Sequence, residues 1–297
     1  MSNLFIQSLA KFTNTSHALK THYDSEFWQL VREQAESRLA AATRPNGTLI
    51  WSKLPSLLTT NPKVEKSPET DEKYLVQILH LAPSFASLFN TCSKATLGCG
   101  TNCLNESGHG QKHMMHKGTH SVHVARVIRT LIWFRYRDQF KAKFQRELDS
   151  QRVKAYRLGA TPVVRPNGTS DLRFESLWPE LFNDNPDVVF YDYTKDIGRN
   201  VSHIPNYSLC YSVSEESTDI AIKLAFRNGM NCVVVGRLKR NDSKPESYMG
   251  RRVVNGDSHD LRFLDPKGVF VILFAKGHAY NDTTGFVRDL EKESAHV

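Results

Sequence analysis

Three of the five cysteines lie close together in the segment TCSKATLGCGTNCLNESGHG (91–110), where Cys92, Cys99 and Cys103 have the spacing C-x6-C-x3-C. Thiolate sulfur is a soft ligand that suits both zinc and iron–sulfur clusters. Three thiolates on one glycine-rich loop suit a [4Fe–4S] cluster, in which cysteine holds three irons and the fourth iron is open to another ligand. We therefore expect these three cysteines to bind a [4Fe–4S] cluster.

Two alternatives stay open, a zinc site and unligated thiols. The segment after the cysteines is rich in histidine, and His113 or His116 could complete a Cys3His zinc site. The spacing nevertheless lacks the paired C-x2-C hooks of a zinc ribbon. Cys210 and Cys232 lie inside apolar runs, where cysteine usually acts as a small hydrophobe, so we expect both to be structural.

The composition favours an intracellular, cytoplasmic protein. No run approaches the roughly 20 apolar residues that span a bilayer, so no membrane association is expected. The first residues, MSNLFIQSLAKFTNTSHALK, lack the pattern of a secretory signal peptide. Thiols stay reduced inside cells, which disfavours disulfides and makes metal ligation the leading interpretation of the cysteine loop.

The elements that must position this loop read as alternating strands and helices. A helical extension is expected over residues 1–73, with a helix beginning at Asp24 or Ser25. After it, residues 74–290 contain about six continuous apolar runs separated by helical stretches, the longest at 119–159. Such strands are typical of a parallel sheet buried on both faces. We predict an α/β fold, a partial, mostly parallel (β/α)6-type barrel.

Polar residues follow several of the predicted strands. In parallel α/β folds ligands bind at the carboxyl ends of the strands, so these residues are expected to line one pocket for a cofactor or other small molecule. The candidates are Asn167, Gly168, Thr169, Ser170, Asp171, Asp192, Lys195, Ser214 and Lys276. Carboxylates and lysines there could orient a substrate or move protons, but no nucleophile–base pair can be assigned from sequence.

The net charge of +8 is concentrated in one segment. Residues 111–157 hold twelve Lys or Arg against three acidic residues, interleaved with aromatics. Basic and stacking groups together suit DNA or RNA, and we expect binding through residues 112–157, with Arg126, Arg129 and Arg137 contacting phosphate. The alternative is a solvated helix face whose aromatics pack against the core.

Five motifs give the chain a family resemblance. GCGTNCLNESGHG, RPNGTSDLRFE, FYDYTKD, YSVSEE and GDSHDLRFLDPKG occur in this order between about residues 74 and 288. Together they resemble the phage "gene product 88" family, bacteriophage proteins of poorly defined function. The resemblance implies a phage origin and hence the cytoplasm of an infected host cell.

A second, more distant resemblance is to radical S-adenosylmethionine enzymes. In that group a three-cysteine loop follows the first strand of a partial (β/α)6 barrel, and the open iron binds the amine and carboxylate of S-adenosylmethionine. The turn Asn167-Gly168-Thr169 lies where those enzymes contact the methionine amine. Their spacing is C-x3-C-x2-C, so cluster binding transfers to this chain better than cleavage of S-adenosylmethionine does.

Two classes of function follow. As an enzyme, the protein would bind and reduce S-adenosylmethionine at the open iron and act on a nucleic-acid-related substrate. As a non-catalytic module, it would use an iron–sulfur or zinc (Cys3His) site as a structural staple and would bind nucleic acid or protein.

Overall fold

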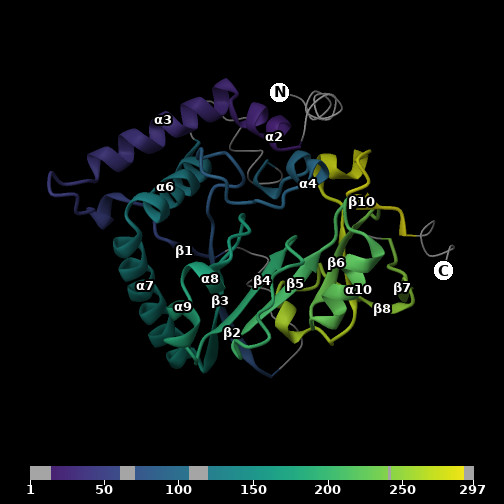
Figure 1. Ribbon diagram of the computed structural model, residues 1–297. Coiled ribbons are helices and arrows are strands. Elements are labelled where there is room, and N and C mark those ends of the chain that lie inside the picture. Colours follow the sequence, from purple (N-terminus) through teal and green to yellow (C-terminus); the bar gives the residue numbers. More distant parts are fainter. Residues whose placement is uncertain (1–14, 61–70, 107–119, 240–241, 291–297) are drawn as a thin grey trace. The chain divides into compact units, whose positions relative to one another are not determined.

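The computed structural model describes residues 15–60, 71–106, 120–239 and 242–290. These residues form a mixed α/β fold (Figure 1). The longer helices are α2 (Thr15–Tyr23), α3 (Glu26–Ala41), α6 (Ser121–Arg135), α7 (Arg137–Leu158) and α10 (Asp219–Arg227), and the short ones are α4 (Leu97–Thr101), α8 (Phe174–Leu177) and α9 (Glu180–Asn183). None of the described helices is long and apolar enough to cross a membrane.

The strands join in a ten-stranded sheet that is mostly parallel and does not close on itself. The strands are β1 (Leu58–Thr59), β2 (Lys73–Leu79), β3 (Ala160–Arg165), β4 (Val189–Thr194), β5 (Tyr207–Ser212), β6 (Asn231–Gly236), β7 (Ser247–Tyr248), β8 (Arg251–Asn255), β9 (Phe270–Phe274) and β10 (Val287–Arg288). Their order is β1-β2-β3-β4-β5-β6-β9-β8-β7, with β10 paired to β6. The strands from β3 to β6 are sequential and parallel. The predicted α/β class with a mostly parallel sheet is confirmed, and the partial barrel stays a prediction.

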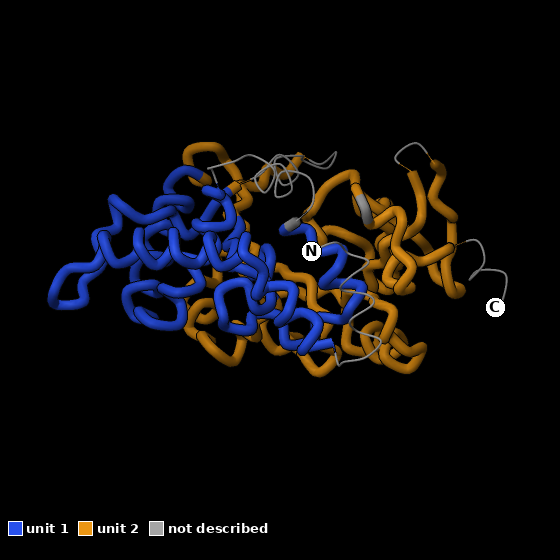
Figure 2. Tube along the Cα trace, turned by 90° about the horizontal axis from the view of Figure 1, so that it is seen from above, with its two compact units in different colours: residues 1–59, 78–154, 167–170 blue, residues 60–77, 155–166, 171–297 orange. Residues whose placement is uncertain are grey.

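Two compact units interleave along the chain (Figure 2). Unit 1 comprises residues 1–59, 78–154 and 167–170, and unit 2 comprises residues 60–77, 155–166 and 171–297. The strand β2 is shared between the units. The boundary predicted from the sequence near residue 73 stays a prediction.

Unit 1 packs α3 against α6 through their apolar faces. Ser25 lies at the N-cap of α3, as predicted, and Trp28 and Val31 are buried on its inner face. The Trp28 ring packs edge-on against His123 of α6, with ring centroids 5.3 Å apart. The predicted helical stretch 119–159 is confirmed as α6 and α7, and α7 ends before Gly159, whose φ of +58° is one that glycine adopts without strain.

In unit 2, alternate residues of β4 contribute to two buried faces of the sheet. Phe190 is buried on one face, where the ring of Phe182 from α9 packs edge-on against it at 5.0 Å. Phe182 also stacks on Tyr207 of β5, at 4.4 Å. On the opposite face the Tyr191 ring lies 5.7 Å from Phe263, in the short 3-10 helix Arg262–Leu264. Both faces of this part of the sheet are therefore covered, as the continuous apolar strands predict.

The Phe182 contacts generate a prediction about stability. Phe182→Ala removes a fully buried ring between α9 and the sheet, so the free energy of unfolding should fall by about 3–5 kcal/mol. Leu177→Ala, in neighbouring α8, is the control, because that side chain is exposed and its loss should change stability by less than about 0.5 kcal/mol. Urea titration of both variants measures the difference. Equal losses would contradict the packing described.

Candidate functional site

The cysteine loop follows β2 in unit 1, and side-chain hydrogen bonds hold its backbone. Thr91 Oγ1 donates to the Ala82 carbonyl at 2.6 Å at the start of the loop. Thr96 caps α4, where its hydroxyl accepts from the Cys99 amide at 3.3 Å. A Cβ on Gly100 would come within 2.2 Å of Leu19 Cδ2, so glycine here lets α4 approach α2 without displacing the Leu19 side chain. The loop is therefore fixed around Cys92 and Cys99 by local bonding and close packing.

Cys103 lies near the basic face of α6. The Arg126 guanidinium donates to Asn105 Oδ1, and Asn105 Nδ2 lies 3.3 Å from His123 Nδ1. Burial lowers the pKa of Arg126, and its attraction to the Cys103 thiolate opposes that shift. Asn105 and His123 are fully buried. A fixed cation thus favours negative charge on the sulfur of Cys103.

The turn after β3 meets the same loop within unit 1. The Cys92 thiol donates a weak hydrogen bond to the Thr169 carbonyl at 3.9 Å, and Thr169 Oγ1 donates to the Leu81 carbonyl at 2.5 Å. A Cβ on Gly168 would come within 2.5 Å of Ile78 and His80, so this position also requires glycine. The sequence predicted that the turn and the loop lie together, and these contacts join them.

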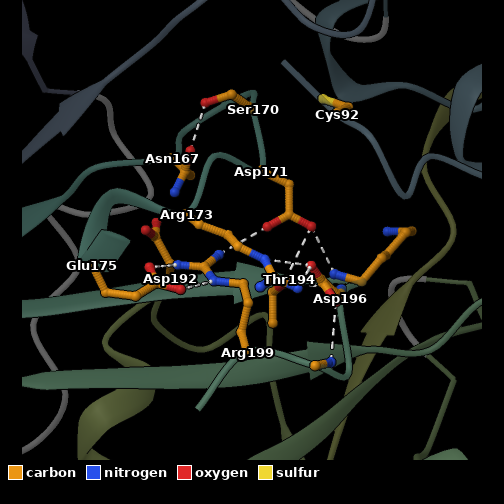
Figure 3. Close-up of polar contacts among 12 residues, drawn as sticks. Cys92, Asn167, Ser170, Asp171, Arg173, Glu175, Asp192, Thr194, Asp196 and Arg199 are labelled. Carbon is orange, nitrogen blue, oxygen red and sulfur yellow. Dashed lines mark hydrogen bonds and ion pairs between the residues drawn. The ribbon is translucent and has the colours of Figure 1, made fainter. Parts of the chain in front are cut away.

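Within that turn, Ser170 donates its hydroxyl proton to Asn167 Oδ1 at 2.8 Å, and both side chains are buried (Figure 3). The four predicted residues Asn167, Gly168, Thr169 and Ser170 all belong to unit 1. The other five predicted pocket residues belong to unit 2. The pocket prediction therefore divides between the units, and each group is described separately.

The five cysteines fall into two environments. Cys92, Cys99 and Cys103 are partly exposed, whereas burial raises the pKa of the Cys210 and Cys232 thiols to about 12. Among the described residues, no three His, Cys, Asp or Glu side chains converge closely enough to hold a metal ion. His113 and His116 lie outside the described residues. The loop has the ligand chemistry of a soft-metal site, and its thiols would have to draw together around an ion.

In unit 2 a buried arginine organises the residues after β3 and β4. The Arg199 side chain has no exposed surface and forms ion pairs with Asp171 Oδ1 at 2.9 Å and Glu175 Oε2 at 2.8 Å (Figure 3). It also donates to the Tyr207 hydroxyl at 2.7 Å, and Tyr207 donates to Asp192 Oδ2 at 2.9 Å. Burial lowers the pKa of Arg199, but these partners outweigh it and hold the pKa above its usual range. Asp171 and Asp192 therefore serve a buried charge network.

The remaining predicted residues lie along the carboxyl ends of the strands in unit 2. The Lys195 amide donates to Asp171 Oδ2 at 2.9 Å, and Lys195 Nζ donates to Ser212 Oγ at 3.0 Å. Ser214 is buried, and its carbonyl accepts from Arg288 at 2.7 Å. Lys276 is exposed and pairs with Asp257 at 2.8 Å. Asp171 and Lys195 are thus brought together, while Ser214 and Lys276 have separate partners.

Of the three arginines predicted to contact phosphate, Arg129 is buried, whereas Arg126 and Arg137 are partly exposed. Arg129 is buried and donates to the Ser56 carbonyl at 2.6 Å. Burial, with Arg126 nearby, lowers the pKa of Arg129 to about 10. Arg137 stacks on the Trp133 ring at 4.2 Å, and its Nε donates to the Trp133 carbonyl at 3.3 Å. The burial of Trp133 agrees with the core alternative, and nucleic-acid binding through residues 112–157 stays a prediction.

A second polar cluster in unit 2 was not identified from the sequence. Asp260 Oδ2 accepts from Arg165 at 3.2 Å and from the Tyr191 hydroxyl at 3.1 Å, and Asp260 Oδ1 accepts from the Tyr193 hydroxyl at 2.9 Å. The alternation Tyr191, Tyr193 along β4 was the available signal, because it places two phenols on one face. The local sequence could not show that these tyrosines pair with Asp260, which lies 69 residues after Tyr191 and 67 residues after Tyr193.

The model of the family "Gene product 88" matches residues 55–290. The chain belongs to this family. The match covers most of the chain and extends the resemblance noted between residues 74 and 288 in both directions. No curated protein and no solved structure matches the chain. Membership in the gene product 88 family makes a bacteriophage origin plausible.

The Arg199 network generates a prediction for this gene product 88 chain. Arg199→Ala leaves Asp171 and Glu175 as buried carboxylates without their cation, which should destabilise the protein by about 3–5 kcal/mol. Arg173→Ala is the control, because Arg173 pairs with Asp196 at 2.6 Å but its side chain is 48% exposed, and the loss should stay below about 1 kcal/mol. Chemical denaturation measures both. A loss of stability for Arg199→Ala no larger than that for Arg173→Ala would contradict the central role of Arg199 in this network.

Asp265 generates a prediction about pH. Burial raises the pKa of Asp265 to about 6, and Arg262, whose Nη1 lies 3.2 Å from Asp265 Oδ2, opposes this shift only in part. The native state then binds a proton that the unfolded state releases, so this group's contribution to stability is present below about pH 4 and lost as pH rises through about 6.

Asp265→Asn removes this titration. The stability of the variant relative to the wild type should therefore rise by about 2–3 kcal/mol between pH 4 and pH 7. Denaturation of both proteins across this range measures the change. A difference that falls with pH would show that Arg262 stabilises the carboxylate more than burial destabilises it.

Proposed function

We propose that this protein is a phage-type iron–sulfur protein in which Cys92, Cys99 and Cys103 hold a [4Fe–4S] cluster beside the turn of residues 167–170. The observation that supports this most directly is the contact between Cys92 and the Thr169 carbonyl in unit 1. This contact brings the loop that is predicted to ligate the cluster next to the turn that is predicted to bind a small molecule. A partial (β/α) barrel with the cluster at its mouth is part of the proposal, and the sequential parallel order from β3 to β6 is consistent with it.

The distribution of charge and burial supports the same loop. The two cysteines outside the loop are buried and held as thiols, whereas the three loop cysteines are partly exposed. Arg126 and Arg129 place positive charge on the α6 side of the loop, and Glu147 contributes only a partial offset at Arg129. Thiolate ligands would place negative charge beside Arg126.

The residues have distinct roles in this proposal. The three cysteines hold the cluster, and Arg126 stabilises negative charge at Cys103. A bound [4Fe–4S] cluster supplies an open iron for an amine or carboxylate ligand and a centre for electron transfer. Asn167 and Ser170, fixed to each other, orient that ligand in unit 1, for which S-adenosylmethionine is the candidate. A structural cluster, or zinc, in a non-catalytic module is the alternative.

Metal analysis of anaerobically purified protein tests the proposal. The protein should be brown and should contain stoichiometric iron and acid-labile sulfide. Cys99→Ser should abolish both, because it removes a thiolate ligand. Cys232→Ser is the matched control: it alters a buried cysteine outside the loop and should leave the iron content unchanged.

The outcomes separate the alternatives. Stoichiometric zinc without iron would overturn the iron–sulfur proposal in favour of a Cys3His site. Metal-free protein after anaerobic reconstitution would overturn both. If the cluster is present, reductant-dependent formation of 5′-deoxyadenosine from S-adenosylmethionine supports an enzyme, and its absence supports the non-catalytic module.

A further inference from the structure

Lys195 and Ser212 meet at the carboxyl ends of two adjacent parallel strands in unit 2. Thr194 and Tyr211 are neighbours in the register of β4 and β5, so the residues that follow them point to the same face of the sheet. Lys195 Nζ lies 3.0 Å from Ser212 Oγ. Both side chains are partly exposed. This pairing is at the edge of a parallel sheet where ligands bind.

The lysine is positioned by a third group. The Lys195 amide donates to Asp171 Oδ2, which also accepts from Thr194 Oγ1 at 3.1 Å. The other oxygen of Asp171 is fixed by Arg199. On the side-chain end, Lys195 Nζ lies 5.4 Å from the centroid of the Phe286 ring, which covers one side of the amine. The backbone and the tip of Lys195 are thus both held next to Ser212.

We propose that Ser212 is a nucleophile activated by Lys195 and that the pair transfers acyl groups from a carboxylic ester. A hydroxyl within hydrogen-bond distance of a base that is itself positioned by a third group is the arrangement that nucleophilic catalysis requires, and serine–lysine pairs are a known variant. This activity goes beyond the proposed function and does not depend on the cysteine loop, because Lys195 and Ser212 belong to unit 2.

The reaction balances with an ester and water alone. Lys195 first releases a proton to solvent. Ser212 Oγ then bonds to the ester carbonyl carbon while its proton moves to Lys195 Nζ, and the carbon–oxygen bond to the alkoxide breaks as that oxygen takes the proton. Water attacks the acyl-serine in the same way and releases the acid. A lysine that is only a structural donor would hold Ser212 equally well but could not accept this proton.

Fluorophosphonate labelling of the full-length chain tests the proposal. An activated serine displaces fluoride and forms a bond to phosphorus, so intact mass and peptide mapping should locate one adduct on Ser212. Ser212→Ala should abolish it. Ser208→Ala is the matched control, because Ser208 lies on the same strand and in the register of the same face, and its variant should be labelled at the wild-type rate.

Lys195→Arg separates catalysis from structure. Arginine keeps the positive charge and a hydrogen-bond donor but cannot act as a base near neutral pH, so labelling should slow by about 100-fold or more. The thermal midpoint of this variant should stay at the wild-type value, which shows that slower labelling is not a consequence of unfolding. Labelling of Lys195→Arg at the wild-type rate, or no adduct on wild-type Ser212, would overturn the proposal.

Discussion

The buried positive charge of Arg199 is the constraint on which the positions of Asp171 and Lys195 in unit 2 depend. A guanidinium with no exposed surface must have its donors matched by acceptors, and here two carboxylates and a phenol do so. Asp171 is fixed in this way, and its second oxygen then holds the backbone at Lys195. Asp171, a candidate for catalysis by residue type, is therefore better understood as the support for the backbone at Lys195.

Residues of β4 form buried polar contacts on both faces of the sheet. Asp192 points to the face where Tyr207 and Arg199 lie, and Tyr191 and Tyr193 point to the face where Asp260 lies. A register shift of one residue would exchange these sets and leave each aspartate beside the wrong partners. The buried polar groups thus specify one register of β4, although apolar burial supplies most of the driving force.

Periodicity predicted the elements well because it depends on local geometry. The helical stretch predicted over residues 119–159 corresponds to α6 and α7, and Val124, Val127 and Ile128 form the buried face of α6. The environment of Arg129 could not be predicted, because Arg129 donates to the Ser56 carbonyl, which is 73 residues away in the chain. Among the candidate pocket residues, Asp192 lies within β4 rather than after it. Whether a carboxylate faces a substrate or an arginine depends on tertiary contacts that the sequence spacing does not record.

The cations beside the cysteine loop restrict what the loop can hold without identifying it. A [4Fe–4S]²⁺ cluster with three thiolates and a zinc ion with three thiolates and a neutral histidine both have a single net negative charge. Either would balance the positive charge of Arg126 near Cys103. The choice between iron and zinc depends on whether a histidine completes the site, because an open fourth position is what makes a cluster chemically useful.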